Sequence, residues 1–475
     1  SRPKLIGFCA MSDQDTIAAV ATPPGVSAVA IIRISGMRSF DIARRCFAPV
    51  HGNVEPQAAR LRRGWIVDPQ SGEKIDDALA VHFRSPKSHT GEDLVELQMH
   101  GGAGVVASCL ALVLRLGARL AQPGEFTKRA FINGRLDLAQ AEAVADLINA
   151  ESERASKAAA HRLAGGVGAQ LRALRSDLLD RLVEIEAHLD YPDEVPEPSM
   201  MRLSATLAQH HARLDALLSG AGAAQVLRDG IECVIAGPPN AGKSSLLNAL
   251  LQAERAIVSD VPGTTRDIIE DRVAVDGVVL RLRDTAGLRN TTDAIEAEGV
   301  SRARRAISDA QLVIAVIDAS KAIGPDDRIA LQQTVGTPRI VLANKLDCGS
   351  HGLDELRASI RESRDGKHDG ANLVIAGSVL WPDTILELRR AIAQLGWGGG
   401  LDGSRALVAN ARQIEALTRA RESLAHAQAT LDQQHPIDLV SADLRDAVAA
   451  YGEVSGDTVT QEVLDGIFSR FCVGK

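Results

Sequence analysis

Hydrophobic and polar positions follow different periods in different regions of the chain. Residues 11–128 contain short strand-like apolar runs, such as AVAIIRI and DLVELQMH, together with one helical stretch around Val105–Leu116. Turn-forming clusters such as TPPG and QPGE separate these segments, so this region is predicted to be an α+β domain. From Leu138 to about Gln225, apolar residues recur at helical spacing, and the segment DYPDEVPEP divides this region into two long predicted helices.

The second half of the chain shows a mixed pattern followed by a helical one. Strands and helices are predicted to alternate first, and helical spacing then returns after the glycine-rich segment GWGGGLDGS and continues to the end. Because neither helical region alone makes a comfortable core, we expect one discontinuous helical domain with the α/β unit inserted into it. The alternative is two separate small bundles. The predicted domains are residues 11–128, 129–227, 228–390 and 391–475.

Composition narrows the class of protein. The chain has 475 residues, of which 45% are hydrophobic and 24% are charged, values typical of a soluble protein with several domains. No apolar run approaches the roughly 18 residues of a membrane-spanning helix, so no membrane partner is expected. The start of the chain lacks the pattern of a signal peptide. Met11 resembles a natural first residue, and residues 1–10 are expected to be an upstream extension with no part in the fold.

Charge and cysteine spacing bear on location and partners. The net charge is −8, so overall charge gives no support for nucleic-acid binding, although a local basic patch can still bind RNA. The cysteines are scattered without a CxxC pair, which argues against a zinc knuckle or a disulfide framework and predicts a reducing cytoplasm. They are Cys9, Cys46, Cys109, Cys233, Cys348 and Cys472.

The segment GPPNAGKSSLLNAL carries the most specific chemistry. Gly237-x-x-x-x-Gly242-Lys243-Ser244 follows the apolar run IECVIA and precedes a predicted helix, which is the strand–loop–helix setting of a phosphate-binding loop. Backbone N–H groups and the positive end of the helix would hold the phosphates. Lys243 is expected to reach the β- and γ-phosphates, and Ser244 is expected to bind Mg²⁺.

A second segment, NKLD, predicts which base is bound. It stands at the end of the apolar run RIVLANK. The carboxylate of Asp347 can accept two hydrogen bonds from the N1–H and the exocyclic amine of guanine, a donor pair that adenine lacks. Asn344 would meet the other edge of the base, and Lys345 would pack its stem on the ring. The chain is therefore expected to bind GTP rather than ATP.

Two more segments lie between these in chain order. GTTRD (263–267) supplies hydroxyls that could close over the γ-phosphate and the metal. DTAGLR (284–289) follows the run VVLRLR and would place Asp284 near the metal and the Gly287 N–H near the γ-phosphate. The four segments together describe a Ras-like P-loop GTPase domain of the α/β class.

A fifth segment, GSVL, is expected to contact the base mostly through its backbone. It departs from the Ser-Ala-Lys that such domains usually carry there. The full set of predicted GTP contacts is Asn240, Ala241, Gly242, Lys243, Ser244, Ser245, Ser259, Asp260, Val261, Pro262, Gly263, Thr264, Thr265, Asp284, Thr285, Ala286, Gly287, Asn344, Lys345, Leu346, Asp347, Ser378, Val379 and Leu380.

The glutamine that orients the attacking water in many Ras-like domains is replaced by Leu288. Leucine forms no hydrogen bond, so another residue must hold the water or hydrolysis is crippled. Glu296 and Glu298 are candidates, and the alternative is that both are solvated helix residues. The oxygen of Asn240 could help to hold a monovalent cation beside the phosphates, or this asparagine could simply stabilise the loop.

Taken together, these motifs resemble the tRNA modification GTPase family MnmE, also called TrmE. The likeness includes DTIAAVATPPG, GEDLVELQMHGG, PGEFTKRAFINGRLDLAQAEAVADLI and the terminal FSRFCVGK, and it covers nearly the whole chain. It implies an N-terminal folate-binding and dimerisation domain, a discontinuous helical domain and an inserted GTPase domain. It also implies work with the flavoprotein MnmG (GidA), as a heterotetramer or larger complex, on C5 of the wobble uridine of certain tRNAs.

The resemblance further implies the one-carbon chemistry. Members add an aminomethyl or carboxymethylaminomethyl group, with 5-formyl- or methylene-tetrahydrofolate as the source of one carbon. Carried over by motif, the folate contacts are Arg33, Glu96, Arg135 and Lys475; Arg135 stands where many relatives have lysine, so charge is kept but geometry is not. The alternative is that Arg33 and Glu96 are surface charges at strand ends. Cys472 is implied to act near the modification chemistry, and the alternative is an inert thiol.

Within the GTPase domain, the resemblance implies potassium activation. Asn240 would bind K⁺ together with Thr264 and backbone oxygens around Ser259 and Val261. Thr265 would join Ser244 on Mg²⁺. Glu296 matches the glutamate that orients the water, which makes it the predicted catalytic residue.

A competing hypothesis is a regulatory or ribosome-assembly GTPase that only switches binding to RNA or protein. The GTPase motifs fit that class equally well. The two ends of the chain favour the modification enzyme, because the competing class would need a KH-like or a second GTPase module, and neither is recognised in the sequence.

Overall fold

The described residues form two compact units, each built from separate stretches of the chain. The computed structural model describes residues 15–51, 59–252, 271–283, 307–362, 372–396 and 407–474. The first unit contains Ser1–Ala145, Arg162–Leu214 and Glu415–Lys475, and the second contains Asp146–His161 and Asp215–Ile414. The expected extension, residues 1–10, lies outside the described part.

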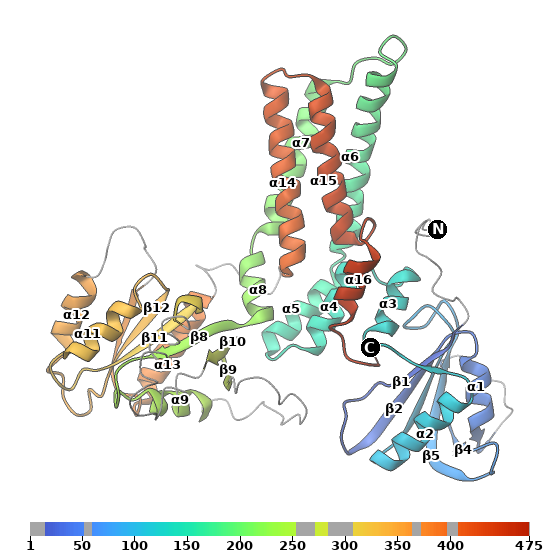
Figure 1. The fold of residues 1–475 in the computed structure, drawn as a ribbon, viewed down its shortest axis with the longest axis horizontal. Helices are drawn as coiled ribbons and strands as arrows, with labels where there is room; N and C mark the ends of the chain where they lie inside the picture. Colours follow the sequence, from blue (N-terminus) through green and yellow to red (C-terminus); the bar gives the residue numbers. More distant parts are fainter. Residues whose placement is uncertain are drawn as a thin grey trace, which may run out of the picture. The chain divides into compact units, whose positions relative to one another are not determined.

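A seven-stranded sheet, in the order β3-β4-β5-β6-β2-β1-β7, opens the first unit. The runs AVAIIRI and DLVELQMH lie in its adjacent strands β2 and β6, whose inward residues Ile32, Ile34, Val95 and Leu97 are fully buried. Helices α1 and α2 pack on this sheet (Figure 1). Its elements are β1 (Ile17–Val20), β2 (Ser27–Ser35), α1 (Ser39–Cys46), β3 (Phe47–Pro49), β4 (Arg62–Val67), β5 (Lys74–Phe83), β6 (Leu94–Gly101), α2 (Ala103–Arg115) and β7 (Arg119–Leu120).

Long helices from both sides of the second sheet in sequence form a bundle that lies mostly in the same unit (Figure 1). Helices α6 (Val167–Asp190) and α7 (Met200–Leu218) precede the second sheet in sequence, whereas α14 (Ala411–Asp432) and α15 (Ile437–Ser455) follow it. Side chains join the two halves: Gln428 on α14 donates to Ser204 on α7 at 3.0 Å, and Arg445 on α15 pairs with Glu186 on α6. The expected discontinuous helical domain is therefore confirmed.

A buried polar group links three helices of this bundle. His210 on α7 is 1% exposed, and its two ring nitrogens lie 3.0 Å from the Asp177 carboxylate on α6 and 3.3 Å from the Tyr451 hydroxyl on α15. Burial raises the pKa of Tyr451, so its hydroxyl stays protonated and can donate. Because a buried polar group needs partners, this trio fixes how the three helices pair.

The C-terminal helix packs beside the helix that follows the N-terminal sheet. Phe131, Leu138, Leu464, Phe468 and Phe471 share one buried cluster, and Lys128 pairs with Asp465 at 2.6 Å. These contacts join residues that lie more than 300 positions apart in the sequence. The elements concerned are α3 (Glu125–Ile132), α4 (Leu138–Ile148) and α16 (Gln461–Phe468); α5 (Glu153–Ala164) follows α4 in the sequence.

The second unit is built on a six-stranded sheet in the order β13-β12-β11-β8-β10-β9, which is parallel except for β9. Its central strands are continuous apolar runs because helices cover both faces: α9 and α13 one face, α11 and α12 the other. Its elements are α8 (Ala221–Asp229), β8 (Ile231–Ala236), α9 (Lys243–Gln252), β9 (Asp271–Val275), β10 (Val278–Arg283), β11 (Leu312–Asp318), α11 (Pro325–Gln333), β12 (Arg339–Asn344), α12 (Leu353–Glu362), β13 (Asn372–Ala376) and α13 (Pro382–Gly396).

Two further findings concern the described residues alone. None of their helices is both long enough and apolar enough to cross a membrane. Their cysteines are unpaired: Cys46, Cys109 and Cys233 are buried, and Cys348 and Cys472 are exposed.

Candidate GTP site and C-terminal site

The predicted phosphate loop connects β8 to α9. Gly237 has φ +145°, and a Cβ there would lie 2.2 Å from the Val316 carbonyl oxygen. Gly242 has φ +107°, and a Cβ there would lie 2.2 Å from Nδ2 of Asn344. Both positions therefore need glycine, because φ is positive and because another segment lies too close to leave room for a Cβ.

Two polar residues of the loop have defined positions. The ammonium group of Lys243 donates to the carbonyl oxygens of Gly237 at 2.7 Å and Pro238 at 2.8 Å, so this lysine folds back over the loop. Helix α9 begins at Lys243, so the first N–H groups of the helix lie at the loop, where they favour anions. Asn240 has φ +62°, a conformation that asparagine tolerates better than most residues.

Asn344 joins the phosphate loop to the base segment. Its side chain is fully buried, donates from Nδ2 to the Ala241 carbonyl oxygen at 2.8 Å, and accepts at Oδ1 from the Val379 N–H at 3.0 Å. In this structure the amide of Asn344 therefore holds three segments of one site together, and it is engaged within the protein at both ends.

The residues after Asn344 present the charges of the base segment. Lys345 has φ +65°, and its ammonium group pairs with the Asp318 carboxylate at 2.8 Å. Burial raises the pKa of Asp318, but hydrogen bonds from Lys345 and Ser320 outweigh burial and hold it below its usual range. Hydrogen bonds from Ser378 and Cys348 lower the pKa of Asp347. The Asp347 carboxylate is therefore ionised at neutral pH, as an acceptor of two guanine N–H groups must be.

Asp318 is a member of this site that the sequence motifs missed. It ends the fully buried strand β11 and stands beside Asn344 in the parallel register of β11 and β12. A signal was present in the sequence, because the carboxyl ends of neighbouring parallel strands meet at one edge of the sheet. A carboxylate directly after a buried apolar run could have been recognised on this basis.

The remaining nucleotide residues divide into described and undescribed ones. In the GSVL segment, Ser378 is buried and Leu380 is 73% exposed. The Leu346 N–H donates to the Gly377 carbonyl at 3.1 Å. At the start of α9, Ser244 and Ser245 are exposed. Outside the described residues lie Ser259, Asp260, Val261, Pro262, Gly263, Thr264, Thr265, Arg266, Asp284, Thr285, Ala286, Gly287, Leu288, Arg289, Glu296 and Glu298.

The predicted folate residues Arg33 and Glu96 lie opposite each other on β2 and β6. The guanidinium of Arg33 donates to Oε1 of Glu96 from Nε at 3.0 Å and from Nη2 at 2.8 Å. It also donates from Nη1 to the Gly474 carbonyl at 3.4 Å and lies 5.6 Å from the centre of the Phe126 ring. The C-terminal segment thus reaches the charged pair, although Lys475 itself lies outside the described residues.

Arg135 and Cys472 complete the described part of this set. Arg135 donates from Nε to the Ser88 carbonyl at 3.0 Å, whereas the described hydrogen bonds of Arg33 go to Glu96 and Gly474. Cys472 is exposed, and its carbonyl accepts from the Gly124 N–H at 3.3 Å. A Cβ on Gly474 would lie 2.2 Å from the Val20 carbonyl, so the chain end runs close against β1.

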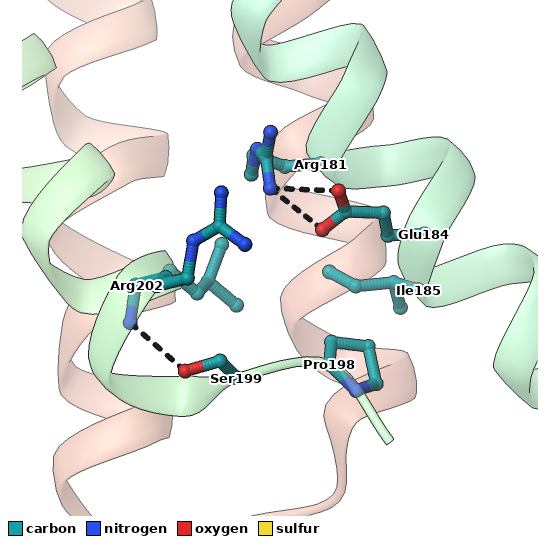
Figure 2. Close-up of a pocket in the computed structure, with 7 residues that line it drawn as sticks. Arg181, Glu184, Ile185, Pro198, Ser199 and Arg202 are labelled. Carbon is teal, nitrogen blue, oxygen red and sulfur yellow. Dashed lines mark hydrogen bonds and ion pairs between the residues drawn. The ribbon is translucent and has the colours of Figure 1, made fainter. Parts of the chain in front are cut away.

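A pocket between α6 and the start of α7 is a different kind of feature (Figure 2). It is lined by two arginines, Arg181 and Arg202. Both Nη1 contacts of Arg181 go to the Glu184 carboxylate, at 2.7 and 2.8 Å. This carboxylate offsets the charge of Arg181, and the guanidinium of Arg202 is the remaining charge among the lining residues.

The glycine loop between β8 and α9 and the base segment at the end of β12 together define a P-loop GTPase. Residues 138–472 match the family model described as the MnmE helical domain, and residues 16–135 match the one described as the GTP-binding protein TrmE N-terminus. The chain belongs to the MnmE (TrmE) family of tRNA modification GTPases.

Relatives in this family match over their full length. The tRNA modification GTPase MnmE of Symbiobacterium thermophilum is 44% identical over 469 residues, which is 97% of this chain and 100% of the relative. That of Moorella thermoacetica is 44% identical over 465 residues, 97% of this chain and 99% of the relative. Among solved structures, Era in a complex with MgGDPNP and nucleotides 1506–1542 of 16S ribosomal RNA is 25% identical. The match covers 41% of this chain and 66% of that chain, with a TM-score of 0.27.

Proposed function

We propose that the protein hydrolyses GTP to GDP and phosphate at the site between β8 and β12. The observation that carries this proposal is the buried amide of Asn344, which ties the phosphate loop to the base segment at 2.8 and 3.0 Å. If a nucleotide is bound by both segments, the amide of Asn344 fixes the distance between the segment that holds the base and the loop that holds the phosphates. Asp347 would select guanine, Lys243 would meet the β- and γ-phosphates, and Ser244 with Thr265 would bind Mg²⁺.

We further propose that this hydrolysis serves tRNA modification in the cytoplasm. Relatives that match over their full length carry the name tRNA modification GTPase. The proposed reaction adds an aminomethyl or carboxymethylaminomethyl group to C5 of the wobble uridine. The proposed partners are tRNA, a second copy of this chain that pairs through the N-terminal domain, residues 11–128, and the flavoprotein MnmG.

The one-carbon donor, a tetrahydrofolate, is proposed to bind where the chain end meets β2 and β6. Arg33 supports this because its guanidinium already holds both Glu96 and the Gly474 carbonyl, so one cation organises the strands and the C-terminus. Arg33→Ala is expected to abolish calorimetric binding of 5-formyltetrahydrofolate and to leave GTP affinity unchanged. Normal folate affinity in that variant would place the donor elsewhere.

Hydrolysis is proposed to depend on potassium. With Leu288 in place of glutamine, the charge that develops on the phosphoryl group needs another cation. Asn240 would hold K⁺ with Thr264 and the backbone oxygens of Ser259 and Val261, and Glu296 would orient the water.

Steady-state hydrolysis in K⁺ and in Na⁺ tests this proposal. The φ of +62° makes Asn240→Gly a cleaner variant than alanine, because glycine keeps the backbone conformation while the side-chain oxygen is lost. We expect K⁺ to accelerate the wild type by about tenfold or more, and we expect this gain to disappear in Asn240→Gly with GDP affinity unchanged. Glu296→Ala is expected to lower kcat by about 10²-fold or more.

Arginine variants distinguish the rival explanation, an arginine finger. Arg266→Ala and Arg289→Ala should each keep the difference between the two salts. Equal rates in K⁺ and Na⁺, with collapse only in one of these arginine variants, would exclude the potassium mechanism.

A further inference from the structure

Residues 146–161 pack with the GTPase unit although they precede its first strand, β8, by a long stretch of sequence. They comprise the last residues of α4, a short connection and most of α5. Asp146 anchors this segment, because its carboxylate accepts from Nε of Arg228 on α8 at 2.6 Å. Since α8 leads directly into β8, the segment is attached at the start of the strand that carries the phosphate loop.

The segment's second attachment is the closed end of the β9–β10 hairpin. Asp276 and Gly277 form its two-residue turn, with φ values of +48° and +91°. Two positive φ values are typical of the tight turns whose twist matches that of the paired strands. The inward residues of both strands, Val273, Val275, Val278, Leu280 and Leu282, belong to the core of the GTPase unit.

Ser152 makes two hydrogen bonds that have different roles. Its hydroxyl oxygen accepts from the Ala155 N–H at 3.1 Å, which caps the N-terminus of α5. The same hydroxyl donates its one proton to the Gly277 carbonyl oxygen at 3.0 Å. The cap of α5 and the hydrogen bond to the hairpin turn therefore depend on a single side chain.

Neighbouring side chains hold the same turn. Arg154 lies across Gly277, where a Cβ would come within 2.6 Å of its Cδ. Glu151 pairs with Arg272 on β9, and on the α13 side Arg389 donates to the Asp276 carboxylate at 2.9 Å. The Glu151–Arg272 pair is exposed and contributes little by itself, so Ser152 and Arg154 are the main contacts from α5.

In the sequence, the β9–β10 hairpin lies between the GTTRD and DTAGLR segments. Strand β9 begins shortly after the GTTRD segment, and β10 ends at Arg283, directly before the DTAGLR segment. A hydrogen-bonded strand pair moves as one piece, and five residues of strand place its ends about 17 Å apart. A shift at the turn is therefore carried to Asp271 and Arg283, the strand ends from which the chain leads on to these two segments.

We propose that the N-terminus of α5 sets the position of the β9–β10 hairpin, which makes Ser152 and Arg154 positioning residues for GTP hydrolysis. This inference rests on the proposed function. Helices α4 and α5 each continue into the first unit, at Leu138–Ala145 and Arg162–Ala164.

Variants of Ser152 separate the effect of its hydrogen bond to Gly277 from the effect of its cap on α5. Ser152→Asp keeps an acceptor for the Ala155 N–H, but its carboxylate cannot donate to the Gly277 carbonyl. Ser152→Thr keeps both bonds, and Ser152→Ala loses both. Lys157→Ala is the matched control, because Lys157 lies on α5 and pairs only with the exposed Glu153 in the described contacts.

The test measures kcat, the GTP dissociation constant and the melting temperature for all five proteins, starting with the wild type. We expect Ser152→Asp and Ser152→Ala to lower kcat by about three- to tenfold, the worth of one hydrogen bond, with GTP affinity within about twofold of wild type. Ser152→Ala should melt earlier than Ser152→Asp, because it alone also loses the cap of α5. Ser152→Thr and Lys157→Ala should match the wild type.

Two outcomes contradict different claims. A wild-type kcat in Ser152→Asp would overturn the positioning role of Ser152 and leave the proposed GTPase activity intact. Absence of hydrolysis in the wild type itself would overturn the proposed function, and with it the inference.

Discussion

At the scale of single residues, buried polar side chains in both units are held by partners from distant parts of the sequence. Asn344 bonds to Ala241 and to Val379, and His210 bonds to Asp177 and to Tyr451. A buried amide or imidazole without partners would cost about 1–3 kcal/mol, so such groups fix one arrangement of their segments. His82 is an exception, because its buried Nδ1 has no hydrogen-bond partner among the described residues.

His82 predicts an acid-sensitive N-terminal sheet. Burial, followed by the charges of Arg62 and Arg84, lowers its pKa from 6.5 to about 4. The neutral form is therefore favoured in the fold, and the stability it contributes is complete above pH 6.5 and is lost as the pH falls towards 4. The linked loss is about 3 kcal/mol across this window.

Amide hydrogen exchange of β5 and β6 at pH 6.5 and pH 4.5 measures this loss. His82→Gln, which carries no charge at either pH, should lose less opening free energy than the wild type over the same interval. Carboxylates that titrate in this window affect both proteins equally, so the difference isolates His82. The same pH dependence in both proteins would show that His82 is not the group responsible.

At the scale of elements, the phosphate loop is shaped by close approach as much as by its own sequence. Gly242 allows Asn344 to reach the loop, because a Cβ would lie 2.2 Å from its Nδ2. Gly242→Ala is therefore expected to weaken GDP binding by about tenfold or more, through strain at φ +107° and displacement of Asn344.

Gly222 provides the matched control for this prediction. It lies in α8, and no atom would lie within 4 Å of an added Cβ. Gly222→Ala should raise stability by up to about 1 kcal/mol, as alanine does inside helices, without an effect on GDP affinity. Fluorescence titration with a labelled GDP measures the affinity of each variant for GDP. Equal affinities in Gly242→Ala and Gly222→Ala would mean that the loop tolerates the extra carbon.

Element by element, the sequence predicted the regular parts of the fold well. The run AVAIIRI lies in β2, DLVELQMH in β6, and the stretch around Val105–Leu116 in α2 (Ala103–Arg115), because each keeps the period of its element. Side-chain partners were harder to predict. Asp318 has no motif of its own, and the bond between Ser152 and Gly277 joins residues whose local patterns indicate only a helix start and a turn.

In the candidate sites, too, the motifs could be predicted from the sequence, whereas the contacts between side chains could not. The phosphate loop and NKLD could be recognised because backbone chemistry at the phosphates and the guanine edge restricts the residue types. The pairing of Arg33 with Glu96 follows only from the register of β2 and β6, which apolar spacing does not specify. The contact of Gly474 with Arg33 depends on how the chain end folds back, and no local pattern predicts that.

At the scale of the whole molecule, the chain combines an α+β N-terminal domain, a discontinuous helical domain and an inserted P-loop GTPase domain. The GTPase unit takes residues 146–161 from a part of the sequence that otherwise belongs to the first unit. We propose that the nucleotide bound at Asp347 controls the modification reaction. A variant that changes only the base it accepts can test this claim.

Asp347→Asn should exchange guanine for xanthine, because the new amide donates where the ionised carboxylate accepted. Loss of the charged pair is worth about 1.5–3 kcal/mol, or roughly ten- to a hundredfold in GTP affinity. The deciding measurement is the yield of modified wobble uridine in tRNA, by nucleoside analysis, with the flavoprotein partner, tetrahydrofolate and K⁺ present. The wild type should require GTP, and Asp347→Asn should require XTP. Equal modification without any nucleotide, or with GTP and XTP alike in both proteins, would contradict the account.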